Sequence, residues 1–210
     1  MDPENKYYKM MFNELDSFEF VDIRTLGMFL LKNVPDYFFS VPASSSGKYH
    51  PAGDLGEGGL VRHSISVMRM LEHILEPEGY YDFTPRQVEL LKLAALFHDC
   101  MKSGTQEQYE KNPHTKFLHP ILAVNFITYI ACLTEFDYDE TMFITSAIAS
   151  HMGQWNTSKH EEGKLPVPKD PHQKALHLAD YLASRKDINI VIGEEQETKE
   201  ETDKEEIIKE

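Results

Sequence analysis

The sequence predicts an all-α fold, and three observations lead to this prediction. Apolar residues recur with helical spacing over most of the 210 residues, whereas the alternation that is typical of strands is scarce. Hydrophobic residues make up 41% of the chain, which is enough for one domain of this length to bury a core. Prolines and glycines divide the apolar segments into pieces of helical length. We therefore expect a single helical bundle around one cavity.

The N-terminal part of the chain, residues 1–40, is expected to form a helical extension of this bundle. Residues 22–32 have an amphipathic pattern, which predicts a helix that is capped by Asp22 and ends before Pro35. Residues 41–59 differ because they are rich in serine, proline and glycine, as loops are. A loop of this length is uncommon inside a compact domain and often carries function. We therefore expect this loop to contribute to a site.

Five further helices are expected after the loop. The first covers residues 60–75 and has one apolar face. The second covers residues 84–99 and begins at Thr84, with Pro85 in the first helical position. Its residues 90–97 are apolar on nearly all sides, so this helix belongs in the middle of the bundle. The remaining three are predicted over residues 118–133, 139–151 and 171–186.

Charge and composition exclude several classes of protein. The formal net charge is −14, of which residues 194–210 contribute −6 and the rest of the chain −8. Residues 191–210 are therefore expected to be a solvated acidic tail. The remaining body lacks the excess of basic residues that long nucleic acids and anionic membranes attract.

The location of the protein is expected to be cytoplasmic. The apolar stretch 117–133 contains His119, Pro120 and Asn125, so it predicts a core helix rather than a membrane span. The first residues do not have the pattern of a signal peptide. Two cysteines are too few for a disulfide framework and suit a reducing compartment.

Two ionisable residues, His98 and Asp99, stand at the end of the most apolar helix. Burying them without partners would cost several kcal/mol. A metal ion would satisfy both, and the alternative is a histidine that caps its own helix with an aspartate in the following turn. Four other residues favour the metal ion, because each lies near a helix end or on an apolar face: His63, His119, His151 and Asp180. Imidazole and carboxylate ligands suit divalent ions, and the sequence does not distinguish manganese, iron, zinc, nickel and magnesium.

The order His63, His98-Asp99 and Asp180 resembles the HD superfamily of metal-dependent phosphohydrolases over about residues 42–186. Further matches are the two additional histidines of two-metal members and the lysine of the HD-x-x-K form, here His119, His151 and Lys102. Met101 replaces the glycine of the HD-x-G-K form. The segments around His50, Gly59 and Trp155 are similar to those of HD exoribonucleases that act 3′ to 5′ and of HD proteins from phages and mobile elements.

The resemblance implies an HD phosphohydrolase domain over residues 41–190, with a helical bundle around a central metal site. It implies that Asp99 bridges two divalent ions, that His63, His98 and Asp180 complete one, and that His119 and His151 complete the other. Water activated by the ions would then attack phosphorus, and Lys102 would face the phosphate. The alternative for Lys102 is a surface lysine at a helix C-terminus.

Five residues are candidates for binding the substrate, which is expected to be a nucleotide or a short oligonucleotide: Lys48, Tyr49, Arg62, Gln154 and Trp155. Trp155 would stack on a base, and the alternative is that it packs against the bundle. His50 is expected to be an ordinary histidine. Strong binding to long nucleic acid is not expected, because few basic residues are available to contact its phosphates.

Two other functions remain open at this point. HD-type diiron oxygenases use the same histidines and aspartates to activate oxygen, and a binding protein would sense a nucleotide without turnover. Lys102 and the loop over 41–59 favour phosphate chemistry over oxygen chemistry.

Overall fold

The computed structural model describes residues 3–44, 47, 50–77, 79, 81–188 and 190. Within these residues the protein is all-α, as predicted, and β structure is limited to an isolated bridge between Thr157 and Lys164. The predicted acidic tail, 191–210, lies outside the described residues. The elements of the described part are α1 (Lys6–Asp16), α2 (Val21–Asn33), the 3-10 helices η1 (Asp36–Phe39) and η2 (Ala52–Asp54), α3 (Gly59–Leu75), α4 (Pro85–Phe97), α5 (Gln106–Lys111), α6 (His119–Leu133), α7 (Tyr138–Ser150) and α8 (Pro171–Ala183).

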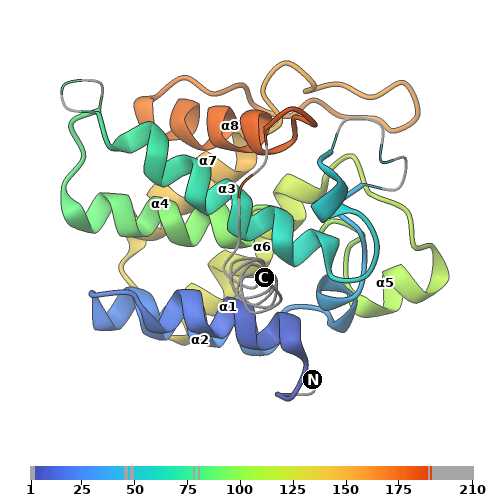
Figure 1. Cartoon of the computed structure of the whole chain (residues 1–210), viewed down its shortest axis with the longest axis horizontal. Coiled ribbons are helices and arrows are strands. Elements are labelled where there is room, and N and C mark those ends of the chain that lie inside the picture. The colour runs from blue at the N-terminus through green and yellow to red at the C-terminus, as the bar shows by residue number, and fades with distance from the viewer. Residues whose placement is uncertain are drawn as a thin grey trace, which may run out of the picture.

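Helix α3 runs through the middle of the bundle (Figure 1) and packs against α4 and α8. Helix α7 packs against α4, α6 and α8, so these helices close around a common centre. Helices α1 and α2 lie together along one side of the bundle in Figure 1, and their buried residues belong to the same hydrophobic core as those of α3 and α4. The N-terminal part of the chain is therefore helical and packs directly on the bundle.

The N-terminus of α2 differs from the prediction. Asp22 is not the N-cap residue; that position belongs to Phe20, which has no capping side chain. Asp22 lies in the first turn and accepts hydrogen bonds from the guanidinium of Arg86. The buried carboxylate of Glu89, on α4, accepts the backbone N–H groups of Glu19 and Phe20 at 2.6 and 2.9 Å. Helix α4 thus binds the two N–H groups just before α2, whereas no side chain caps the first turn of that helix.

The predicted start of α4 is confirmed. Thr84 is its N-cap residue and forms a capping box with Gln87, and Pro85 occupies the first helical position. Every apolar side chain from Leu90 to Phe97 is buried, as expected for the central helix. The short helix α5, which buries none of its residues, was not predicted.

The loop before α3 folds back onto the first turn of that helix. A Cβ atom at Gly59 would lie 2.1 Å from the carbonyl oxygen of Asp54, so this close approach requires glycine. Gly58, just before the helix, has a φ of +69°, which also favours glycine. The contact brings η2, which ends in Asp54, against α3.

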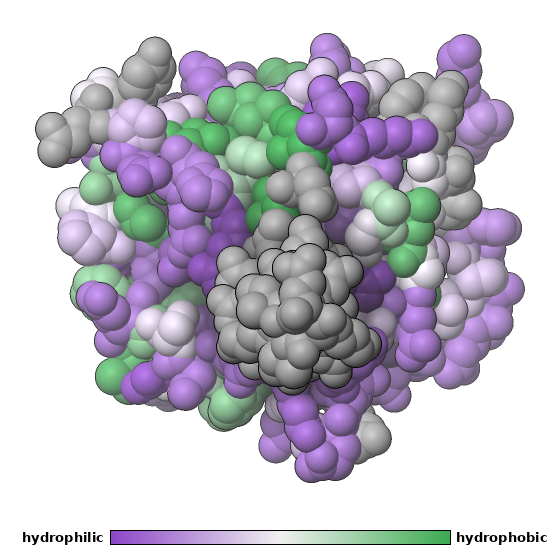
Figure 2. Space-filling view, viewed as in Figure 1, coloured by the Kyte–Doolittle hydropathy of each residue, from purple (hydrophilic) through white to green (hydrophobic). Residues whose placement is uncertain are grey.

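No helix in the described residues is long and apolar enough to cross a membrane. Helix α6, predicted as a core helix, buries His119, Ala123, Ile127 and Ile130. On the face drawn in Figure 2, hydrophilic residues predominate and hydrophobic residues form separate patches.

Candidate metal centre

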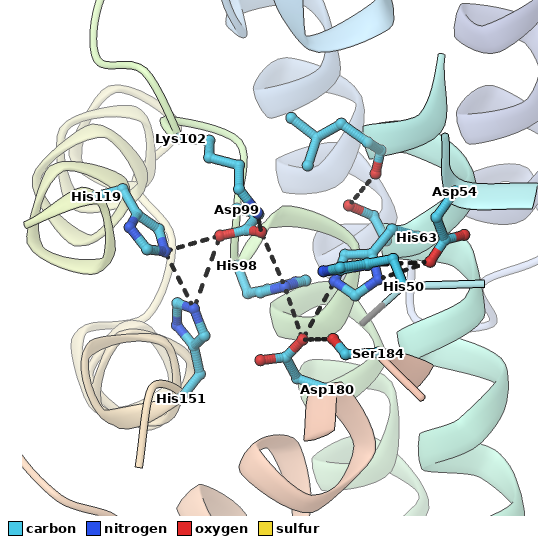
Figure 3. Close-up of polar contacts among 12 residues, drawn as sticks. His50, Asp54, His63, His98, Asp99, Lys102, His119, His151, Asp180 and Ser184 are labelled. Carbon is cyan, nitrogen blue, oxygen red and sulfur yellow. Dashed lines mark hydrogen bonds and ion pairs between the residues drawn. The ribbon is translucent and has the colours of Figure 1, made fainter. Parts of the chain in front are cut away.

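Six ionisable side chains converge inside the bundle (Figure 3), from α3, α6 and α8 and from the residues directly after α4 and α7. Five of the six residues are at most 3% exposed. The side chain of the sixth, Asp180, is 19% exposed. We call this set the metal centre: His63 on α3, His98 and Asp99 directly after α4, His119 at the start of α6, His151 directly after α7, and Asp180 on α8. These are the six residues that the sequence analysis singled out as metal ligands.

One part of the metal centre is formed by His63, His98 and Asp180. The Oδ1 atom of Asp180 lies 3.2 Å from Nε2 of His63 and 3.8 Å from Nε2 of His98. These three ligand atoms are close enough together to hold a single metal ion.

The other part is formed by Asp99, His119 and His151. The Oδ1 atom of Asp99 lies 2.9 Å from Nε2 of His119 and 3.7 Å from Nε2 of His151. Its Oδ2 atom lies 3.6 Å from Nε2 of His98, on the side of the first part. Asp99 therefore stands between the two parts and presents one oxygen to each.

Three of the histidines have the same local hydrogen bond, from Nδ1 to the backbone carbonyl three residues earlier. The carbonyl acceptors are Ala95 for His98 (2.8 Å), Lys116 for His119 (2.7 Å) and Ile148 for His151 (2.7 Å). A carbonyl only accepts, so Nδ1 carries the proton and Nε2 of each neutral ring carries a lone pair. Because such a partner fixes the tautomer of a metal-binding histidine, the three rings are oriented as metal ligands are.

The polar atoms of the metal centre do not satisfy one another. The Nε2 atoms of His119 and His151 lie 3.4 Å apart, and two lone pairs at that distance need a cation or a proton between them. Nε2 of His98 and Oδ1 of Asp99 are buried without a hydrogen-bond partner of good geometry. A buried polar atom without a partner is costly, and a divalent ion would satisfy these nitrogen and oxygen atoms together. The donor set therefore fits a divalent metal ion.

The charges of the metal centre are strongly coupled. Burial alone would raise the pKa of Asp99, but the cation of Lys102 and the facing rings of His98 and His119 hold it well below its usual range. Burial lowers the pKa of His151 to about 3, so this ring is neutral. Burial would also lower the pKa of His63, but hydrogen bonds to Asp180 and Asp54 raise it to about 9. The centre therefore contains two ionised carboxylates, because the pKa of Asp180 is lowered as well, through its hydrogen bond to His63, against the effect of burial.

The metal centre opens into a cavity of about 570 Å³. Lys102 lines this cavity, and its Nζ atom lies 2.5 Å from Oδ2 of Asp99. Trp155 lines it as well and stacks on Tyr181, with ring centroids 5.8 Å apart and an interplanar angle of 19°. Arg185, which the sequence analysis did not consider, also lines the cavity, with its guanidinium 4.4 Å from the centre of the Tyr181 ring.

Two of the other predicted substrate-binding residues, Gln154 and Arg62, do not line the cavity. Gln154 is exposed and does not line the cavity. Lys48 and Tyr49 lie outside the described residues. The guanidinium of Arg62 donates to backbone carbonyls of the preceding loop, and Arg62 does not line the cavity.

Sequence reasoning missed a second carboxylate beside His63. Asp54 lies in η2, 3% exposed, with Oδ2 3.4 Å from Nδ1 of His63 and 3.4 Å from Nδ1 of His50. His50 was expected to be an ordinary histidine, but it lines the cavity. The available signal was the unusual length and glycine content of the loop over 41–59.

Comparison with known proteins identifies a family. The sequence model of the HD domain family matches residues 60–185, which contain all six members of the metal centre. No curated protein and no solved structure matches the chain.

Proposed function

The chain belongs to the HD-domain family, and we propose that it is a two-metal phosphohydrolase that acts on nucleotides or short oligonucleotides. HD domains bind divalent metals and are commonly metal-dependent hydrolases, which is the general activity that the family assigns. The number of ions, the reaction at phosphorus and the substrate belong to the proposal.

The observation that carries the proposal is the pair of Nε2 atoms of His119 and His151, 3.4 Å apart with Oδ1 of Asp99 beside them. Both rings donate Nδ1–H to backbone carbonyls, so neither can donate through Nε2 while it is neutral. A site for a single ion at His63, His98 and Asp180 would require an additional proton on one of these two rings. A second ion beside Asp99 accounts for them.

The residues of the chain divide the work as follows. When bound, divalent ions activate water for attack on phosphorus and offset the negative charge of phosphate oxygens. Asp99 holds the two parts of the metal centre together, because its two oxygens face opposite sides. Lys102 places a cation at the edge of the cavity, where it can bind a phosphate oxygen.

The cavity beside the metal centre supports a substrate with an aromatic base. The indole of Trp155 is 46% exposed, and stacking on Tyr181 holds it in place at the wall of the cavity. A nucleobase stacked on such a side chain gains about 1–3 kcal/mol. The cavity volume of about 570 Å³ lies within the usual range of small-molecule sites, roughly 300–1,000 Å³.

The test is hydrolysis by protein that has been freed of metal and then supplied with manganese. The substrates are phosphomonoesters, dNTPs, linear and cyclic dinucleotides, and short RNA and DNA. We expect turnover of at least one nucleotide, its loss in EDTA, and a decrease of at least about a hundredfold in Asp99→Asn, with the exposed Asp139→Asn as matched control. Turnover that is equal in Asp99→Asn and wild type would contradict the proposal. Nucleotide binding without any turnover would indicate a sensor, and a visible absorption band after iron loading in air would indicate a diiron oxygenase.

The size of the substrate has its own test. The body of the chain carries a net charge of −8, so we propose that long nucleic acid binds weakly. We expect kcat/KM for a dinucleotide to exceed that for a thirty-mer at one salt concentration. A tenfold preference for the thirty-mer, equivalent to about 1.4 kcal/mol of transition-state binding, would show that the chain engages polymer.

A further inference from the structure

A buried carboxylate lies behind His63, on the side of the ring that faces away from Asp180 (Figure 3). Oδ2 of Asp54 is 3.4 Å from Nδ1 of His63, whereas Nε2 of the same ring is 3.2 Å from Oδ1 of Asp180. Nδ1 of His63 is buried and has no hydrogen-bond partner of good geometry, and this carboxylate oxygen is the acceptor beside it. Asp54 is 3% exposed and His63 1% exposed, so bulk water does not compete for this contact. His50 directs its Nδ1 at the same oxygen of Asp54 from 3.4 Å.

His63 needs such an acceptor because of its place in the fold. His98 and His151 stand directly after their helices and His119 begins one, and each donates Nδ1–H to the backbone carbonyl three residues earlier. His63 lies inside α3, where backbone carbonyls accept the hydrogen bonds of the helix. The carbonyl three residues before it, that of Leu60, also accepts from the hydroxyl of Ser64. Asp54, which lies outside α3, therefore offers Nδ1 of His63 the hydrogen-bond acceptor that backbone carbonyls offer to the other three rings.

The backbone around Asp54 holds the carboxylate in this place. The carbonyl oxygen of Asp54 accepts from the backbone N–H of Ala43 at 3.0 Å, and its N–H donates to the carbonyl of Pro51 at 3.1 Å. Arg62, one residue before His63, donates to the carbonyls of Gly53 and Leu55, which flank Asp54. Arg62 and the backbone hydrogen bonds therefore hold Asp54 next to His63.

The ligand atoms of His50, Asp54 and His63 can interact in two ways. Either each ring donates its Nδ1–H to the carboxylate, or the three atoms hold a metal ion. The three ligand atoms are close enough together to hold an ion. If Nε2 of His63 binds an ion of the metal centre, however, a second ion at Nδ1 would require the ring to lose both protons. An imidazole that keeps its Nδ1 proton and donates it to a carboxylate is the arrangement that metal-binding histidines usually adopt.

We propose that Asp54 is a positioning residue of the metal centre: it accepts the Nδ1–H of His63, fixes the ring, and directs the Nε2 lone pair towards Asp180 and His98. This inference rests on the proposed metal binding. Loss of such a partner typically lowers metal affinity 10- to 100-fold. Asp54 touches neither the reacting phosphate nor the ion in this arrangement, so the expected effect falls first on metal affinity.

The experiment compares zinc binding by the full chain and three variants, in competition with a chromophoric chelator. Asp54→Asn keeps the shape and an acceptor oxygen but loses the charge, and Asp54→Ala loses both. Glu57→Gln, an exposed acid of the same loop, is the matched control. We expect the zinc dissociation constant to rise about tenfold in Asp54→Asn and up to about a hundredfold in Asp54→Ala, with no change in Glu57→Gln.

A second measurement detects the hydrogen bond directly. In zinc-loaded protein, the Nδ1–H proton of His63 is expected to give a resolved downfield NMR signal, because the bond to Asp54 protects it from exchange. The signal should move in Asp54→Asn and broaden beyond detection in Asp54→Ala. A general loosening of the fold would not select this one proton, and Asp54→Asn tests the proposal even if Asp54→Ala does not fold.

The outcomes are distinguishable from failure of the proposed function. If wild type binds zinc and both Asp54 variants bind it equally well, the positioning role is overturned while the metal centre stands. If Asp54→Asn loses one bound ion per chain without weakening the others, Asp54 is itself a ligand and the proposal is also overturned. If wild type binds no zinc, the proposed metal centre fails, and the role of Asp54 fails with it.

Discussion

Arg62 is expected to stabilise the loop before α3, and replacing it tests this role against the predicted role in substrate binding. Its Nη1 and Nη2 atoms donate to the carbonyls of Glu57 and Leu55 at 2.9 and 3.0 Å, and Nε donates to that of Gly53. The guanidinium also lies 5.4 Å from the centre of the Tyr7 ring. Arg62→Lys keeps the charge, but a single ammonium group cannot reach three carbonyls in the geometry of the planar guanidinium.

The magnitude follows from the bonds that are lost. Two of three hydrogen bonds would disappear, each worth about 0.5–1.5 kcal/mol, and partial exposure of Arg62 places the sum at roughly 1–2 kcal/mol. For a chain of this size, 1 kcal/mol corresponds to about 2–4 °C in Tm, so Arg62→Lys should lower Tm by about 2–8 °C. Zinc affinity should fall as well, because the same loop carries Asp54.

Thermal unfolding by circular dichroism and zinc titration measure the two effects. The matched control is Arg24→Lys, since Arg24 donates to a single carbonyl, that of Asp16, at 3.4 Å. An Arg62→Lys variant with unchanged Tm and zinc affinity, but a raised KM for nucleotide, would refute the structural role and restore the role in substrate binding.

Three further predictions concern other parts of the bundle. Glu89→Ala should lower the free energy of unfolding by roughly 2 kcal/mol in urea titration, because two amides at the start of α2 lose their acceptor; a change below about 0.5 kcal/mol would mean that water replaces the carboxylate. The hydrogen bond from Arg86 lowers the pKa of Asp22 below its usual 3.8, so the stability that Asp22 adds is present above pH 3.8 and fades as the pH falls. Asp22→Asn should therefore be less stable than wild type at pH 7, and the difference should shrink as the pH falls below 3.8; a constant difference would contradict this. Trp155→Ala should raise KM about tenfold for a nucleotide but not for glycerol phosphate, and an equal rise for both would assign Trp155 to packing.

The helices were predictable where their signals are local. Thr84 and its partner Gln87 lie three residues apart, so the start of α4 can be found from the sequence. The cap predicted at Asp22 is wrong because α2 begins at Val21 with Phe20 as its N-cap residue. The acceptor for the N–H groups before the helix, Glu89, is about 70 positions away, and only packing brings it there. Helix α5 has no buried residue, so no hydrophobic period marks it, although the capping box of Thr105 is a local signal that could have found it.

The six residues of the metal centre were singled out by their positions at helix ends or on apolar faces, and the family resemblance added which of them share an ion. Spacing places His63 or Asp180 on a helix, but it does not say that α3 and α8 will meet. Asp54 and Arg62 could not be assigned from the sequence, because their contacts arise only when the loop folds back on α3 at Gly59. The partners of such residues are set by tertiary contacts, and no local sequence pattern indicates them.

The spread of the metal centre along the chain has a consequence for fragments of the protein. His63 and Asp180 are separated by 117 positions, and the other four members lie between them. A truncation that removes α8, or one that begins after α3, keeps most of the bundle but lacks a ligand of the first part. A chain cut within a connecting loop still contains all six, and it will retain bound ions for as long as the helices on either side of the cut stay packed. Ion retention would therefore measure whether α3, α4, α6, α7 and α8 stay packed together, not the state of any single one of them.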